Sequence, residues 1–175
     1  MVTRTTTYDY EVSSEGGGKH WEVPYANLKD TTPALHDPAC VNAPVAEAAA
    51  GDAPLNELTG TVLSLDADDS MAVIDFDSMV YRHNVRTVTG WTAGPTENAW
   101  AQINLGDIVY YDAESDSVNG VKLSLAALRA DGTTYNPVFG VIVLDQDETA
   151  ASYPKGAAEP TEGETHACAV RQKGF

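Results

Sequence analysis

The sequence predicts an all-β fold, a small β-barrel or β-sandwich domain preceded by a long extended N-terminal arm. From Thr59 onward, short runs rich in β-branched and aromatic residues alternate with turn residues, which is typical of a barrel or sandwich. Earlier in the chain, prolines at positions 24, 33, 38 and 44 and three glycines at 16–18 prevent long helices and interrupt strand hydrogen bonding. We therefore expect an arm over residues 1–52 and a β-domain over residues 53–175.

The arm and the start of the β-domain carry three local patterns. Residues 8–12 alternate apolar and acidic side chains, as in a strand with one buried face. Residues 41–53 are rich in alanine and predict a single helical turn at most. Residues 60–65 and 71–76 flank an acidic turn at 66–70, which predicts a β-hairpin.

Five further strands are predicted in the β-domain, at 79–88, 106–111, 121–123, 138–144 and 166–171. The run 138–144 is apolar throughout, so both of its faces are expected to be buried. Residues 125–129 predict a short helix. The glycine and proline residues within 89–98 and 153–165 predict that these segments are loops.

The charge of the chain excludes several classes of partner. Ten Lys and Arg against 26 Asp and Glu give a net charge of −16. Such a chain is repelled by the phosphates of nucleic acids and by anionic membrane surfaces, so we expect neither as a partner. The longest apolar run is far too short to span a bilayer, and the first thirty residues lack the apolar core of a signal peptide.

The two cysteines allow three interpretations. His36 and Cys40, together with His166 and Cys168, hold the donor atoms of a zinc site, but the two pairs are distant in sequence and neither has a C-x-x-C spacing. Cys40 and Cys168 could instead form a disulfide between arm and domain. We favour two unpaired, apolar-like thiols and expect no metal.

No motif for catalysis or cofactor binding is present. Asp66, Asp68 and Asp69 lack the glycine and terminal glutamate of an EF-hand loop, which favours a solvated acidic turn over an ion site. Ser152 and Lys155 have S-x-x-K spacing, but Pro154 prevents the helix that this chemistry needs. We expect no enzyme activity and no cofactor.

Several segments of the β-domain follow the order of a known family. They read G-T-V-L at 60–63, A-V-I-D-F-D-S-M-V-Y at 72–81, I-N-L-G-D-I-V-Y-Y-D-A at 103–113, F-G-V-I-V-L at 139–144 and A-V-R at 169–171. In order and spacing, residues 53–175 resemble the small phage capsid cement, or head decoration, proteins.

The resemblance implies a non-enzymatic virion protein, made in the host cytoplasm and placed on the outer surface of the expanded head. Its partner would be the phage major capsid protein, and it would form a homo-oligomer, with a trimer favoured. An aromatic-bearing arm suits attachment by strand addition to a neighbouring sheet. The expected capsid-binding residues are Tyr8, Tyr10, Val12, Trp21, Tyr25, Met79, Tyr81 and Trp91.

Two alternatives remain open from the sequence. The chain could be a carbohydrate- or receptor-binding β-module on a virion fibre or spike, with Trp91 or Trp100 stacking on a sugar ring. Its acidity could also reflect a salt-adapted host instead of a role on the capsid.

Overall fold

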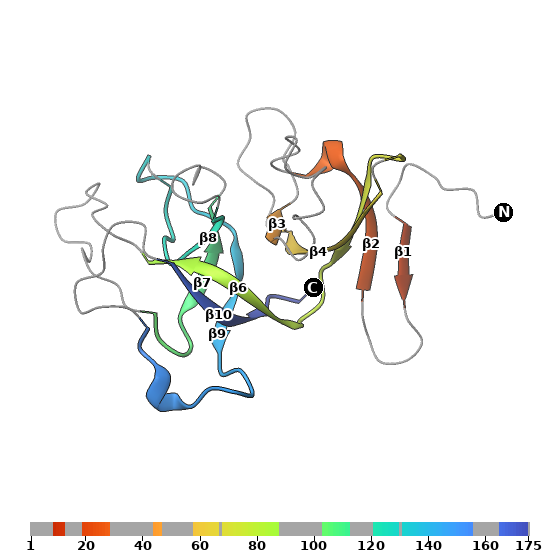
Figure 1. Ribbon diagram of the computed structural model, residues 1–175. Coiled ribbons are helices and arrows are strands. Elements are labelled where there is room, and N and C mark those ends of the chain that lie inside the picture. The colour runs from red at the N-terminus through yellow and green to blue at the C-terminus, as the bar shows by residue number, and fades with distance from the viewer. Residues whose placement is uncertain are drawn as a thin grey trace. The chain divides into compact units, whose positions relative to one another are not determined.

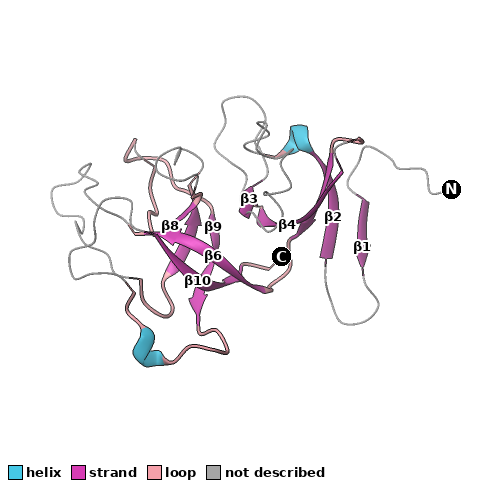
Figure 2. Ribbon diagram, viewed as in Figure 1, coloured by secondary structure: helices cyan, strands magenta, loops and turns pink. Residues whose placement is uncertain are grey.

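The computed structural model describes residues 9–12, 19–28, 44–46, 58–66, 68–87, 103–112, 121–129, 131–155 and 165–174 (Figure 1). Over these residues the chain forms ten strands and two single-turn 3-10 helices, so the predicted all-β class is confirmed (Figure 2). The chain divides into two compact units. Unit 1 comprises Met1–Ser78 with Gly174–Phe175, and unit 2 comprises Met79–Lys173.

Unit 1 contains an antiparallel sheet of five strands in the order β1-β2-β5-β4-β3. The strands are β1 (Asp9–Val12), β2 (Lys19–Pro24), β3 (Pro44–Ala46), β4 (Thr59–Asp66) and β5 (Met71–Asp75). The predicted hairpin is confirmed as β4 and β5, which pair with a bulge between Val62 and Ser64. A 3-10 turn, η1 (Tyr25–Asn27), follows β2.

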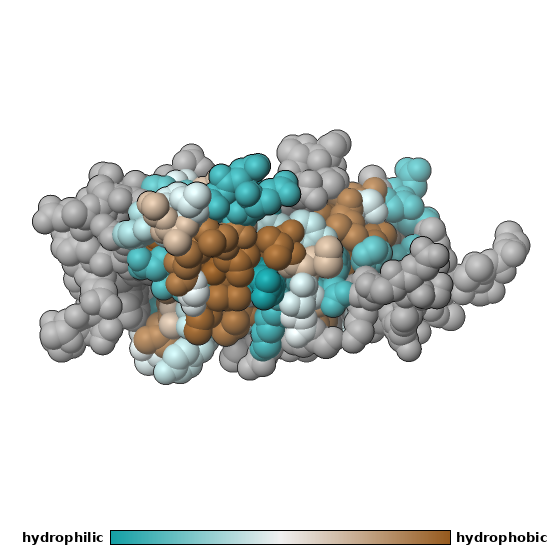
Figure 3. Space-filling view, turned by 90° about the horizontal axis from the view of Figure 1, so that it is seen from below, coloured by the Kyte–Doolittle hydropathy of each residue, from teal (hydrophilic) through white to brown (hydrophobic). Residues whose placement is uncertain are grey.

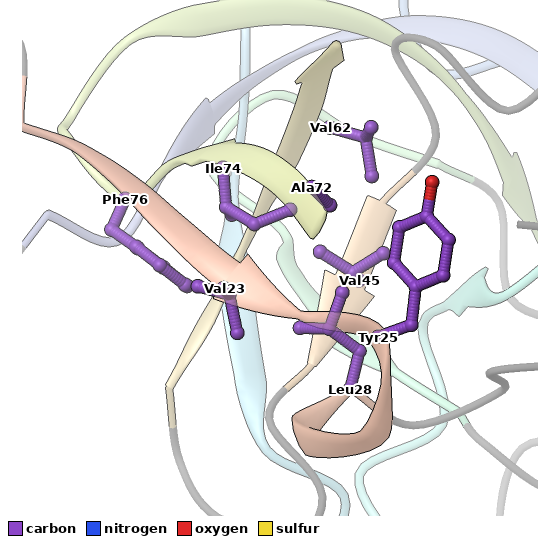
Figure 4. Packing of buried hydrophobic residues seen from close by; sticks show 8 residues of the cluster. All are labelled: Val23, Tyr25, Leu28, Val45, Val62, Ala72, Ile74 and Phe76. Carbon is purple, nitrogen blue, oxygen red and sulfur yellow. The ribbon is translucent and has the colours of Figure 1, made fainter. Parts of the chain in front are cut away.

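One hydrophobic core joins strands β2, β3, β4 and β5 of unit 1 (Figure 4). Its buried members are Val23, Tyr25, Leu28, Val45, Val62, Ala72, Ile74 and Phe76. Strand β2 lies beside β5 with Trp21 opposite Ile74, and β3 takes an edge position, which tolerates the missing N–H of Pro44. Residues 19–28 and 44–46 therefore pack with the hairpin, and the two compact units divide between Ser78 and Met79.

Unit 2 is a closed barrel of five strands in the order β10-β6-β8-β7-β9. They are β6 (Val80–Arg86), β7 (Ile108–Tyr111), β8 (Leu123–Ser124), β9 (Val138–Val143) and β10 (Thr165–Gln172). The fully buried apolar side chains include Val85, Val109, Tyr111, Leu123, Phe139, Ile142, Cys168 and Val170. A closed barrel leaves no strand edge unpaired, in contrast to the open sheet of unit 1.

Two local predictions differ from the structure. The short helix predicted over 125–129 is wrong, because the Ala126 N–H donates to Ser124 Oγ and Leu128 bridges Tyr135. In the alanine-rich segment, strand β3 occupies Pro44–Ala46, and the rest of the segment, where a helical turn is predicted at most, lies outside the described residues. The sequence predicts that both faces of 138–144 are buried. Strand β9 has only one fully buried face, because Val141 on the other face is half-buried.

Candidate functional site

A row of four side chains crosses the outer surface of the unit 2 barrel. Arg171 on β10 lies opposite Val80 on β6 and opposite Val141 on β9, and Val141 lies opposite Ile108 on β7. Directly opposed residues of antiparallel strands share a face of the sheet. Val80 is 45% exposed and Ile108 is 48% exposed, so this face points to solvent. We call Val80, Arg171, Val141 and Ile108 the outer row.

The outer row belongs to an exposed apolar surface. Met79, which precedes Val80 in the chain, is 51% exposed. Figure 3 shows apolar side chains gathered on the face of unit 2 that is seen from below. Contiguous exposed apolar side chains with a single charge among them are typical of protein interaction surfaces. Arg171 supplies that charge. Its guanidinium group suits an interface because it is planar and can form bidentate hydrogen bonds.

A network of charged side chains fixes the chain that follows β9. Glu148 accepts hydrogen bonds from Lys155 Nζ at 2.6 Å and from Tyr153 Oη at 2.7 Å. Arg82 on β6 pairs with Asp145 at 2.5 Å and with Glu148 at 3.3 Å. The Lys155 and Tyr153 hydrogen bonds lower the pKa of Glu148 to about 2, so its carboxylate stays charged at neutral pH. Two cations and two carboxylates thus hold residues 145–155 against the barrel.

The interior of the barrel holds two titratable groups that are neutral at neutral pH. His83 and Cys168 lie opposite each other on β6 and β10. Burial lowers the pKa of His83 to about 4 and raises the pKa of the Cys168 thiol to about 11. A thiol with such a pKa is a poor nucleophile. Cys168 serves as an apolar core residue, as the sequence predicted for this position.

The part of the chain that the structure describes contains no group of side chains that could hold a metal ion. Within those residues, no three His, Cys, Asp or Glu side chains are arranged to hold an ion. His36 and Cys40, the other half of the hypothetical zinc set, lie outside the described residues. Cys168 is a free, buried thiol, and Cys40 lies outside the described residues.

The acidic turn of the predicted hairpin has local hydrogen bonding. The Oδ1 atom of Asp66 accepts the backbone N–H groups of Asp68 at 3.1 Å and of Asp69 at 3.2 Å. All three residues are exposed, which matches the solvated turn predicted from the sequence.

The structure places the expected capsid-binding residues in different environments. Tyr8 and Trp91 lie outside the described residues, and of Tyr10 and Val12 only the backbone of β1 is described. Within unit 1, Trp21 packs edge-on against Phe76 with ring centroids 5.4 Å apart, and Tyr25 is 4% exposed in the core. Within unit 2, Met79 is exposed, and Tyr81 is half-buried with its ring beside His83.

The sequence does not predict the outer row, although it gives Met79, which precedes Val80, as an expected capsid-binding residue. The alternation of residues 79–88 predicted a strand but not which face of it would point outward. Only the pairing of β6, β10, β9 and β7 brings the four side chains of the outer row together.

Comparison of the chain with protein-family models, with curated proteins and with solved structures gives no match. Among the residues that the structure describes, there is no helix with the length and apolar character needed to cross a membrane.

Proposed function

We propose that the protein is a non-enzymatic phage capsid decoration protein. It binds the outer surface of the expanded head and clamps neighbouring major capsid subunits. The observation that supports this best is the exposed apolar surface of unit 2, made of the outer row and Met79. It gives the chain an interaction surface on a rigid barrel, which a clamp requires.

The energetic contribution of this surface is modest for one copy. Burying the exposed half of an aliphatic side chain contributes about 1 kcal/mol, so Met79, Val80 and Ile108 together contribute about 3 kcal/mol. Arg171 adds specificity if a carboxylate of the partner faces it. An oligomer that binds through two or more linked contacts has a far higher overall affinity than a single contact gives. A homo-oligomer, with a trimer favoured, therefore fits this mechanism.

Unit 1 offers a second route of attachment. Strands β1 and β3 are the edge strands of its sheet. An extended segment of a neighbouring subunit can add to such an edge through main-chain hydrogen bonds. The net charge of −16 also favours the outer surface of a shell over a lumen filled with DNA.

The direct test is co-sedimentation of the purified protein with expanded heads that lack it, beside unexpanded precursor heads. We expect saturable, stoichiometric pelleting with expanded heads only. The double variant Val80→Ser and Ile108→Ser should lose at least about tenfold in affinity, which is the loss expected from about 1.4 kcal/mol or more. Tyr135→Ser is the matched control, because Tyr135 is 72% exposed but lies outside the outer row.

The contribution of the N-terminal segment needs a deletion that spares the core. Removing residues 1–25 would remove β2 and the core side chains Val23 and Tyr25. Removing residues 1–12 takes away edge strand β1 and leaves the described core side chains of unit 1 in place, so we expect weaker pelleting with a folded chain. Pelleting of the wild-type protein with neither kind of head would overturn the proposal, and a glycan array would then test the carbohydrate-binding alternative.

A further inference from the structure

A groove of about 490 Å³ lies on the sheet of unit 1. Three carboxylates line it, those of Glu22 on β2, Asp66 at the end of β4 and Asp68 in the hairpin turn. The apolar side chains that line it are Leu65, Met71 and Val73. We call this the acidic groove.

The register of the sheet explains why this composition occurs. Val73 lies opposite Glu22 on one side and opposite Ser64 on the other, and Met71 lies opposite Asp66. Ala72 and Ile74, the alternate residues of β5, are fully buried in the core. Since successive side chains of a strand point to opposite faces, Met71 and Val73 form the floor of the acidic groove on the face away from the core.

We infer that the acidic groove binds an extended segment of a partner protein through a lysine or arginine side chain. Charge complementarity is the first argument. Among the described residues, no basic side chain lines the groove. Unit 1 has 14 acidic and three basic residues, a net charge of −11, so the potential around the groove attracts cations.

The apolar floor distinguishes a basic side chain from a bare metal ion. Lysine and arginine have long aliphatic stems that pack on apolar surface while the charged end remains among carboxylates or in water. Met71 and Val73 match such a stem, whereas a calcium ion needs six to eight oxygen ligands at close range. The groove is also many times larger than a dehydrated ion, and its carboxylates form no metal-binding group within the described residues.

Part of the rim is held in place before any ligand binds. Because Asp66 Oδ1 accepts the N–H groups of Asp68 and Asp69, the carboxylate of Asp66 and the turn that carries Asp68 are fixed relative to β4. A preorganised rim reduces the entropy lost on binding. This inference is independent of the proposed decoration function, since it concerns unit 1 alone and its test uses no capsid.

The test measures binding of a strand-forming peptide of alternating arginine and valine to the full chain by titration calorimetry. A peptide of alternating glutamate and valine serves as the negative control. We expect saturable one-to-one binding of the arginine peptide that weakens as salt rises. Ser64→Arg places a cation in the acidic groove from an exposed strand position and should weaken binding at least about tenfold.

Two matched variants separate the groove from the general negative charge of the chain. Asn84→Arg makes the same change of charge at an exposed position of β6 in unit 2 and should leave the affinity within about twofold. Val73→Ser, which leaves the charge unchanged, should weaken binding several-fold, and Val143→Ser on β9 should not. Thermal unfolding confirms that each variant is folded.

Two results would overturn the inference. Equal weakening by Ser64→Arg and Asn84→Arg would show diffuse attraction to an acidic protein. One-to-one binding of calcium or spermine that displaces the peptide at lower concentration would assign the groove to a small cation. Because these measurements use no phage heads, their failure leaves the pelleting experiment unaffected.

Discussion

His83 gives the barrel a stability that depends on pH in a predictable direction. Its side chain is 5% exposed and packs edge-on against Phe139, with ring centroids 5.2 Å apart. Burial favours the neutral imidazole and lowers the pKa from 6.5 to about 4. In the unfolded chain the imidazole is solvated and keeps its ordinary pKa. Between these two values the unfolded chain binds a proton that the folded barrel does not.

The sign and size of the effect follow from this difference. Since the unfolded state binds more protons, the free energy of unfolding falls as pH decreases from 6.5 towards 4. The complete loss is about 3 kcal/mol, and the loss between pH 7 and pH 5 is about 2 kcal/mol. The pKa of Glu148 is lowered to about 2, so in the folded state this carboxylate stays charged throughout that window.

The assay is urea unfolding at pH 7 and pH 5, followed by the methyl NMR signals of Val170, which lies inside the barrel. Following a residue of unit 2 assigns the transition to the unit that contains His83. His83→Leu is the reference variant, because it keeps an apolar side chain at this position and removes the titrating group. An equal loss of stability in both proteins, or a His83 titration midpoint near 6.5, would refute the reasoning.

Three further predictions concern unit 2. Gly140→Ala should destabilise the barrel by about 3 kcal/mol, because the added Cβ would fall on the Arg171 carbonyl; unchanged urea unfolding would contradict this. Glu148→Gln should lower the free energy of unfolding by about 1–3 kcal/mol at pH 7 and by much less near pH 2. The reason is that the stabilisation from a lowered carboxylate pKa is lost as pH falls from 4.5 towards 2. An equal loss at both pH values in urea unfolding would argue against this prediction. In a Cys40→Ser background, the buried Cys168 thiol should react with a disulfide reagent only after unfolding, and rapid reaction of the folded protein would show that the barrel opens.

The strands of the fold were predictable where the signal is local. The hairpin of β4 and β5 has two apolar runs around a short acidic turn, and its pairing needs no information from elsewhere in the chain. The role of Trp21 and Tyr25 was different. Their neighbours in sequence offer no core, which predicts contact with a partner, whereas in the structure β2 pairs with β5 and Tyr25 is buried in the core of unit 1. Pairing between segments distant in sequence leaves no periodic signal in either one.

The outer row shows the same limit at a surface. Alternation along β6 separates Val80 and Arg82 from Tyr81 and His83, but period two alone does not say which set faces inward. The sequence predicts Tyr81 as a contact residue, but Tyr81 lies on the same side of β6 as the buried His83. Closure of the barrel determines which side chains of β6 face outward, because it places Val80 and Ile108 on one exposed surface.

The distribution of charge between the units argues that acidity has a local role as well as a general one. Unit 2 contains 12 acidic and seven basic residues, a net charge of −5, against −11 for unit 1. The units differ chiefly in their basic residues, and in unit 2 Arg82, Arg86 and Lys155 form ion pairs with carboxylates. Adaptation to salt would lower the number of basic residues throughout the chain. Three carboxylates of unit 1, those of Glu22, Asp66 and Asp68, line a groove with an apolar floor, and this local arrangement favours a cationic partner.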